Sequence, residues 1–321
     1  MLNRPVAWLL LILLGGTLLG LALVWQGGTP AHDHAAGTAL RVGYAVEAPY
    51  ITLDARGRVS GESAEVLRAT WRLLGQPEPV WVPVPFSRLI HQLEMGRIDV
   101  IAAGLFITPE RSRRVDFSRP TLAVNLALLV RRGNPDRLRT LSDLSADNDL
   151  RLATLDGAIE SRVARAHGIS ARALVTVSDV AEALKLLRAG EVAAFALSAP
   201  SLRHLVRHEP DLEWFEPADL DPERDIGLPA YAWRPGDPRL PTFDAALGRY
   251  LGSAEHLQTV RALGYTSTEI QNARRHADAA AQARTLARAG LHTSPPDAAS
   301  AAPPPESSRR SPTDLSPERQ P

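Results

Sequence analysis

The sequence predicts an α/β protein of two lobes joined by a hinge that the chain crosses twice. Apolar runs of strand length alternate along the chain with segments that have one apolar helical face. Residues 93–103 and 187–197 share one pattern, in which a helix end is followed by a glycine, a polar residue and a buried strand. Polar segments at 131–136 and 217–224 separate the halves, and a cleft between two lobes is a favoured ligand site.

The first half alternates strands and helices. Apolar periodicity predicts a helix over 63–74 that Gly75 ends, and a second helix that begins at a Ser87 N-cap and ends at Gly96. The strands around these helices are expected at 40–45, 80–84 and 98–102.

The second half follows the same order. We expect strands at 150–154, 174–177 and 192–197, with a helix between the last two that Ser178 caps and Gly190 ends. Regular alternation of this kind favours a largely parallel sheet in each lobe.

Both ends of the chain differ from this middle part. Residues 6–25 are apolar and follow Arg4, which predicts an export signal or an N-terminal anchor within 1–27 and a periplasmic location for the rest. Residues 293–321 are rich in proline and serine, as in disordered tails. The other expected parts are a linker at 28–38, a first lobe at 39–132 plus 225–268, a second lobe at 133–224 and a solvated helix at 269–292.

Composition excludes several classes of protein. The 321 residues contain no cysteine, which rules out a disulfide framework, a cysteine-ligated metal and a thiol nucleophile. The chain has 36 basic and 36 acidic residues, so it lacks the net positive charge that would favour binding of nucleic acid. No phosphate-binding glycine loop or GxSxG motif is present, so we expect no cofactor. His204 and His208 lack a third ligand at metal spacing, and we interpret them as solvated rather than as a metal site.

The most informative segment is GLFITPERSRRVDFSRP at 104–120. Thr108 is a good N-cap, Pro109 suits the first helical position and Glu110 suits the first turn, so a strand is expected to run into a helix N-terminus. Such an end favours an anion, and Arg111 could add a bidentate contact to a carboxylate. The alternative is that Arg111 and the arginines after it are solvated surface charges.

This segment resembles the signature of the periplasmic solute-binding proteins of family 3, the receptors of ABC importers. The similarity extends over about 39–268 and includes LRVGYAVEAPY, GRIDVIAAG and AFALS. It implies a bilobal periplasmic-binding fold without enzymatic activity, a small zwitterionic ligand, an ABC permease in the inner membrane as partner, and a monomer. In this family the arginine that matches Arg111 holds the α-carboxylate of the ligand.

A finer resemblance is to the ectoine and hydroxyectoine receptors of this family. It places Glu47, Tyr50, Phe86 and Phe106 in the binding site, together with Gly104 and Thr108 of the signature. Aromatic faces attract a delocalised cation, and Glu47 would neutralise it. Without the resemblance, the two phenylalanines would be read as core residues, Tyr50 as part of a turn and Glu47 as a solvated carboxylate.

The second lobe supplies the other expected contacts. Many amino-acid receptors of the family have an aspartate for the ligand ammonium, and the matching residue here is Ser198, which argues against a standard α-amino acid. The family loop that meets the ligand matches 155–161, where Ala158 and Ile159 would donate backbone N–H groups and Glu160 would make a further contact. Two alternatives stay open: an enzyme like the cyclohexadienyl dehydratases, with Glu47 or Glu160 as general acid, and a sensory module.

Overall fold

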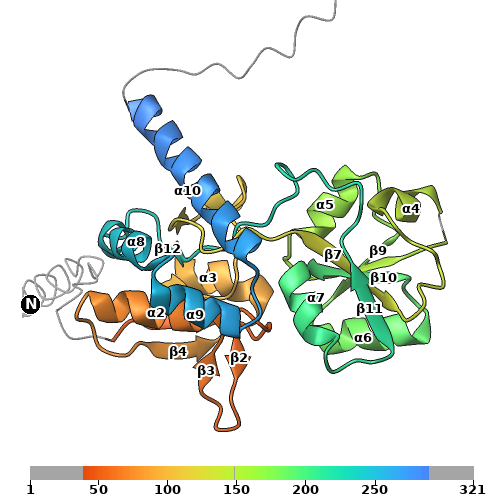
Figure 1. The fold of residues 1–321 in the computed structure, drawn as a ribbon, viewed down its shortest axis with the longest axis horizontal. Helices are drawn as coiled ribbons and strands as arrows, with labels where there is room; N and C mark the ends of the chain where they lie inside the picture. The colour runs from red at the N-terminus through yellow and green to blue at the C-terminus, as the bar shows by residue number, and fades with distance from the viewer. Residues whose placement is uncertain (1–38, 148, 289–321) are drawn as a thin grey trace, which may run out of the picture. The chain divides into compact units, whose positions relative to one another are not determined.

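The computed structural model describes residues 39–147 and 149–288. The expected signal or anchor, the linker and the proline-rich tail therefore lie outside the described residues. In chain order the elements are β1 (Arg41–Tyr44), β2 (Thr52–Leu53), β3 (Val59–Ser60), α2 (Glu62–Leu73), β4 (Val80–Pro83), η1 (Phe86–Arg88), α3 (Leu89–Glu94), β5 (Val100–Ile101), η2 (Arg111–Arg113), β6 (Asp116–Phe117), β7 (Leu126–Arg131), α4 (Leu141–Ala146), β8 (Leu152–Leu155), α5 (Glu160–Ala166), β9 (Leu174–Val177), α6 (Val180–Ala189), β10 (Ala194–Ser198), α7 (Ala199–Leu205), β11 (Leu212–Phe215), β12 (Ala232–Trp233), α8 (Arg239–Tyr250), α9 (Ala254–Ala262) and α10 (Ser267–Arg288) (Figure 1).

The first lobe is built on a sheet with the strand order β4-β1-β5-β12-β6. Neighbouring residues of a strand face opposite sides of a sheet, which gives this sheet two apolar faces. On one face Val42 belongs to a buried cluster with Leu67 of α2 and Phe243 of α8. On the other, Ile101 packs with Leu93 of α3. The lobe is thus a three-layered α/β unit.

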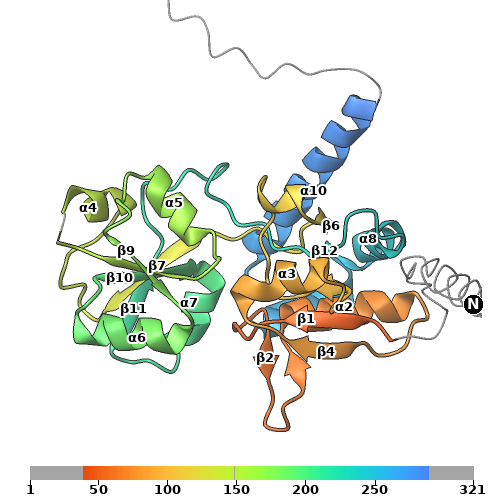
Figure 2. The same cartoon turned by 180° about the vertical axis from the view of Figure 1, so that it is seen from behind.

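The second lobe repeats this arrangement on a sheet with the order β11-β7-β10-β8-β9. Leu128 of β7 belongs to a buried cluster with Leu144 of α4, whereas the next residue, Leu129, belongs to a cluster with Leu187 of α6. Figures 1 and 2 show α4 and α5 on one side of this sheet and α6 and α7 on the other. The α/β, two-lobed fold predicted from the sequence is confirmed.

Two chain segments connect the lobes, and they pair with each other. The Val124 and Gly227 backbones exchange hydrogen bonds of 2.9 and 2.7 Å, and the Thr121 N–H donates to the Pro229 carbonyl at 2.9 Å. The two crossings therefore form a short ribbon rather than two independent linkers.

The predicted lobe boundary at 132 falls too late in the chain. The strand β7, which we assigned to the first lobe, pairs antiparallel with β10 and β11 of the second sheet. The polar segment at 131–136 consequently follows β7 within the second lobe and is not the hinge. An apolar run shows that a strand is buried, but it does not show which sheet the strand joins.

The sheets are also less parallel than predicted. β1 pairs parallel with β4 and β5, and β8 pairs parallel with β9 and β10. The strands next to the crossings, β7 and β12, pair only antiparallel. A chain that enters a sheet from the other lobe has no crossover helix to set a parallel direction.

Several local predictions need correction. Ser87 lies inside the turn η1, and Arg88 precedes α3 without a side-chain cap. Asp179, not Ser178, caps α6 by accepting from the Glu182 N–H at 2.9 Å. The C-terminal helix, expected to be solvated from 269, buries Ile270 in the first-lobe core. Within the described residues, no helix is long and apolar enough to cross a membrane.

Candidate functional site

A cavity of about 20 Å³ lies between the lobes and is lined by both of them. Its lining consists of Glu47, Phe86, Gly104, Phe106 and Arg111 from the first lobe and Ala158, Ile159, Glu160 and Leu197 from the second. All of these except Leu197 belong to the site predicted from the sequence. Of the three other predicted residues, Tyr50 contacts Phe106 and Thr108 contacts Arg111, whereas Ser198 contacts Tyr50.

Arg111 forms the basic end of the cavity. Its side chain is only 8% exposed, and it donates from Nη1 to the Phe106 carbonyl at 2.7 Å and from Nη2 to the Gly157 carbonyl of the second lobe at 2.8 Å. In the described part of the chain, no carboxylate forms an ion pair with it. A guanidinium has five N–H donors, so three remain for an anionic group.

Thr108 positions Arg111, although not in the way we predicted. The Arg111 N–H donates to Thr108 Oγ1 at 3.1 Å, as the sequence pattern indicates. The element that follows is the three-residue 3₁₀ turn η2 and not an α-helix. The predicted helix N-terminus as an anion site is therefore wrong, because one tight turn does not align enough peptide dipoles. Only the Arg111 side chain is left as the anion-binding group of this segment.

Glu47 forms the acidic end and is joined to the second lobe by a chain of hydroxyl groups. Tyr50 Oη donates to Ser198 Oγ at 3.3 Å, Ser198 Oγ donates to Ser201 Oγ at 3.0 Å, and Ser201 Oγ donates to Glu47 Oε1 at 2.8 Å. Ser198 and Ser201 are both nearly fully buried. This chain of hydrogen bonds starts and ends in the first lobe and passes through the start of α7 in the second.

Burial is the main influence on the pKa values of the two acidic groups of the cavity, Glu47 and Glu160. It raises the pKa of Glu47 to about 7, with a further contribution from the charge of Glu160 and an opposing one from the Ser201 hydrogen bond. Burial likewise raises the pKa of Glu160 to about 7. In contrast, burial lowers the pKa of Arg111 to about 10, which still leaves it charged at neutral pH. The cavity therefore holds one fixed positive charge and two carboxyl groups that titrate near neutrality.

The aromatic side chains lie around the middle of the cavity. The rings of Tyr50 and Phe106 meet edge to face with centroids 6.3 Å apart, and the Arg111 guanidinium carbon lies 5.9 Å from the Phe86 centroid. Phe106 also packs against the core of the first lobe, so it serves both the fold and the site. Gly104 has φ +63°, and a Cβ there would lie 2.6 Å from Tyr50 Cγ. Any other residue at this position would therefore clash with the Tyr50 ring.

The second-lobe loop comes close to the first lobe at Gly157. This residue has φ +76°, and a Cβ on it would lie 3.2 Å from the Ser87 Cα. The glycine thus permits both the Arg111 hydrogen bond and the near contact of the two backbones. Ala158 and Ile159 follow it along the cavity wall, and Glu160 begins α5.

Two contributors were missed from the sequence. Leu197 gives the cavity an apolar wall, and Ser201 binds Glu47 directly. The sequence does contain a signal for Ser201. Ser198 and the proline shortly after it mark a helix start, and the Ser198 hydroxyl caps this helix by accepting from the Ser201 N–H.

The histidines remain outside this site. The His204 and His208 rings have centroids 6.1 Å apart at the end of α7. Over residues 39–147 and 149–288, no group of three or more acidic, histidine or cysteine side chains could hold a metal. Two further histidines of the sequence, His32 and His34, lie outside the described residues.

Comparison with known proteins identifies the family of the chain. Residues 40–277 match the bacterial extracellular solute-binding proteins, family 3. A probable amino-acid ABC transporter periplasmic-binding protein of Sinorhizobium fredii is 28% identical over 239 residues, which cover 72% of this chain and 78% of the relative.

Two solved structures are similar in fold. The crystal structure of EhuB in complex with hydroxyectoine has a TM-score of 0.67 and 28% identity, and the match covers 74% of this chain and 91% of EhuB. An ancestral amino acid-binding protein, described as a precursor of cyclohexadienyl dehydratase, has a TM-score of 0.63 at 23% identity, with 71% and 96% covered. The chain therefore belongs to the bacterial extracellular solute-binding proteins of family 3, and its role is to bind a solute outside the cytoplasm for an ABC importer.

Proposed function

We propose that the cavity binds a small zwitterion of the ectoine type, with its carboxylate on Arg111 and its cationic part between Glu47 and the aromatic rings. The observation that carries this proposal is the buried Arg111 guanidinium, which forms no ion pair among the described residues and lines the same small cavity as Glu47. A buried cation without a directly bonded carboxylate is costly, so a ligand carboxylate fits this end of the site.

The cationic end favours a delocalised charge over a primary ammonium. Ser198 already accepts from Tyr50 and donates to Ser201, so its hydroxyl has little capacity left for a ligand. The second lobe has Ser198 and not a carboxylate at this position, so Glu47, held by Ser201, is the carboxyl group next to the serine pair. Rings such as Phe86 and Phe106 hold a delocalised cation through their faces.

The known ligand of a structural relative points in the same direction. EhuB, whose structure contains hydroxyectoine, shares 28% identity and most of its length with this chain. A small-molecule site usually encloses roughly 300 Å³ or more. The lobes must therefore separate to admit such a ligand, as expected of a receptor that closes over its solute.

The test is calorimetric titration of the full-length protein with ectoine, hydroxyectoine, glycine betaine and a set of α-amino acids. Arg111→Ala should weaken binding of the best ligand by about 100-fold or more, because a charge-assisted bidentate contact is lost. Arg113→Ala is the matched control, since Arg113 is an exposed arginine of the same turn. Equal affinity in the Arg111 and Arg113 variants would overturn the assignment of the carboxylate.

One observation supports a catalytic alternative. Glu160 is buried, begins α5 beside Arg111, and has its pKa raised to about 7, so it could hold and donate a proton at neutral pH. A dehydratase of the cyclohexadienyl type would release product from prephenate or arogenate. We favour the receptor, and the absence of turnover with both compounds would eliminate the enzyme.

We also propose that residues 6–25 export the chain and hold it near its permease in the inner membrane. The support is an uncharged apolar stretch of spanning length after Arg4. Membrane fractionation with N-terminal sequencing of the mature protein tests this. Recovery of a soluble protein that begins after residue 25 would refute the anchor and leave a cleaved signal.

A further inference from the structure

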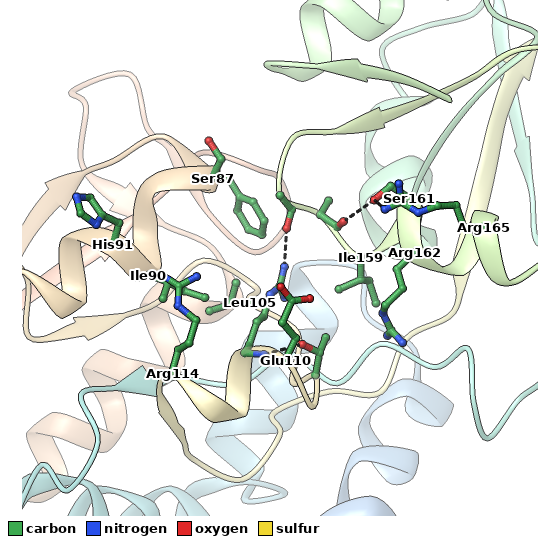
Figure 3. A pocket seen from close by; sticks show the side chains of 15 residues that line it. Ser87, Ile90, His91, Leu105, Glu110, Arg114, Ile159, Ser161, Arg162 and Arg165 are labelled. Atoms are coloured by element: carbon green, nitrogen blue, oxygen red, sulfur yellow. Dashed lines mark hydrogen bonds between the residues drawn. The ribbon is translucent and has the colours of Figure 1, made fainter. Parts of the chain in front are cut away.

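Arg111 also lines a second, larger pocket, which Glu47 does not line. Its volume is about 280 Å³, and it shares Phe86, Arg111, Ala158 and Ile159 with the inner cavity. We call it the outer pocket. The remaining walls come from both lobes, with Ser87 and His91 on one side and Ser161 on the other (Figure 3).

The outer pocket is strongly basic. Arg111 and Arg114 line it from the first lobe, and Arg162 and Arg165 line it from the second. Glu110 is the acidic residue of its lining, and Figure 3 shows this carboxylate between Arg114 on one wall and Arg162 on the other. The lining therefore has an excess of positive charge.

The arginines differ in how far the protein itself neutralises them. Arg114 is held by Glu94 in a bidentate pair with two contacts of 2.8 Å. Arg165 makes only a 3.4 Å contact to Ser161 Oγ. For Arg162, no side-chain hydrogen bond or ion pair occurs within the described ranges. The second-lobe wall thus presents two guanidinium groups without a carboxylate partner.

Closure of the lobes brings like charges together here. Burial is the main cause of the lowered pKa of Arg111. The charges of Glu160 and Glu110 oppose this shift, whereas the charge of Arg162 adds to it. Arg162 comes from the second lobe, so its repulsion of Arg111 partly offsets the attraction between Arg111 and Glu160 across the cleft. An anion placed between the two arginines would convert this repulsion into attraction.

We propose that the outer pocket is a binding site for a small oxyanion, a carboxylate or a phosphate, held between Arg111 and Arg162. The oxyanion is either a free ion or a second acidic group on the solute in the inner cavity, since the two spaces share four lining residues. The proposal does not depend on which zwitterion the inner cavity takes, because an oxyanion alone can be the probe.

The experiment compares the full-length protein with its Arg162→Ala variant and with Arg172→Ala as control. Arg172 is an exposed arginine of the second lobe that does not line either pocket. Inorganic phosphate probes a free ion, and glutamate probes a zwitterion with a second carboxylate. Sodium chloride at equal ionic strength controls for screening.

We expect Arg162→Ala to weaken binding of one of these probes by about tenfold, while ectoine binding stays unchanged. An effect on phosphate in the absence of zwitterion identifies a free ion, whereas an effect on glutamate alone identifies a group on the solute. If both probes bind the Arg162 and Arg172 variants equally, the outer pocket is not an oxyanion site. Failure of the inner-site proposal would instead appear as ectoine affinity that does not depend on Arg111.

Discussion

Lowering the pH from 8 to 5 should weaken binding of a zwitterionic ligand about 100-fold, because Glu47 becomes protonated. The pKa of this carboxyl group in the protein without ligand is raised to about 7, mainly by burial. A ligand cation is attracted by the ionised form and not by the neutral one. The contribution of ionised Glu47 to the binding free energy therefore changes between pH 8 and pH 5.

The magnitude follows from the fraction of Glu47 that is ionised. A group with a pKa of about 7 is about 90% ionised at pH 8 and about 1% ionised at pH 5. If only the ionised form binds, the apparent dissociation constant rises by about two orders of magnitude, or about 2.7 kcal/mol. Binding at pH 8 should also release little proton, whereas binding at pH 6 should release nearly one per ligand.

Calorimetry between pH 5 and 9, in buffers of different ionisation enthalpy, measures both quantities. Glu47→Gln should bind weakly at every pH, because the amide cannot become charged. Glu160→Gln should retain the pH dependence but shift it to lower pH, since the charge of Glu160 helps to raise the pKa of Glu47. A flat profile for the unmodified protein, or an unchanged profile in Glu47→Gln, would refute this reasoning.

Three further predictions concern stability, closure and ligand choice. Burial raises the pKa of Glu62 from 4.5 to about 7, so its contribution to stability is fully present below pH 4.5 and is lost as the pH rises through 7. Glu62→Gln should therefore raise the unfolding free energy, measured by denaturant titration, by up to about 3 kcal/mol at pH 8 but not at pH 4. Equal gains at both pH values would contradict this. Gly157→Ala should weaken ligand binding at least tenfold, because its methyl group would force the Ser87 backbone away. Gly57→Ala is the control, since Gly57 also has a positive φ but no neighbour within 4 Å, and this variant should bind normally. Equal ligand affinities of the two variants would show that the close approach of Gly157 and Ser87 does not matter for binding. Ser198→Asp keeps a good N-cap for α7 and should shift the preference from ectoine towards α-amino acids in a competition titration, and an unchanged ratio would show that this position does not select the cation.

The sequence was sufficient for the lobes and for most of the cavity lining. Helix α2 was predicted within one residue, because apolar spacing and Gly75 define its face and its end. The site residues came from a short signature and from family resemblance, and the structure brings Glu47, Phe86, Phe106 and Arg111 to one cavity. These residues lie far apart in the sequence, so no local pattern alone could have predicted that they line the same cavity.

The errors arise where tertiary contacts decide. An apolar strand such as β7 is compatible with either sheet, and only its pairing with β10 assigns it to the second lobe. The segment after Thr108 has the residues of a helix start, but it turns back after η2 to place β6 against β12. Ser201 contacts Glu47 only when both lobes are folded and near each other, so the helix-start pattern can point to Ser201 but not to its partner Glu47.

Glu269, at the start of α10, adds an ion pair between the two lobes beside the two crossings. Its carboxylate pairs with Arg203 of α7 at 3.0 Å, while its carbonyl accepts from the Ala123 N–H at 3.0 Å. Ala123 belongs to the first crossing, so this carbonyl contact ties α10 to the hinge, while the Arg203 ion pair ties it to the second lobe. We expect the ion pair to oppose twisting of the lobes about the crossings, so that Glu47 and Arg111 meet the same partners when the lobes close.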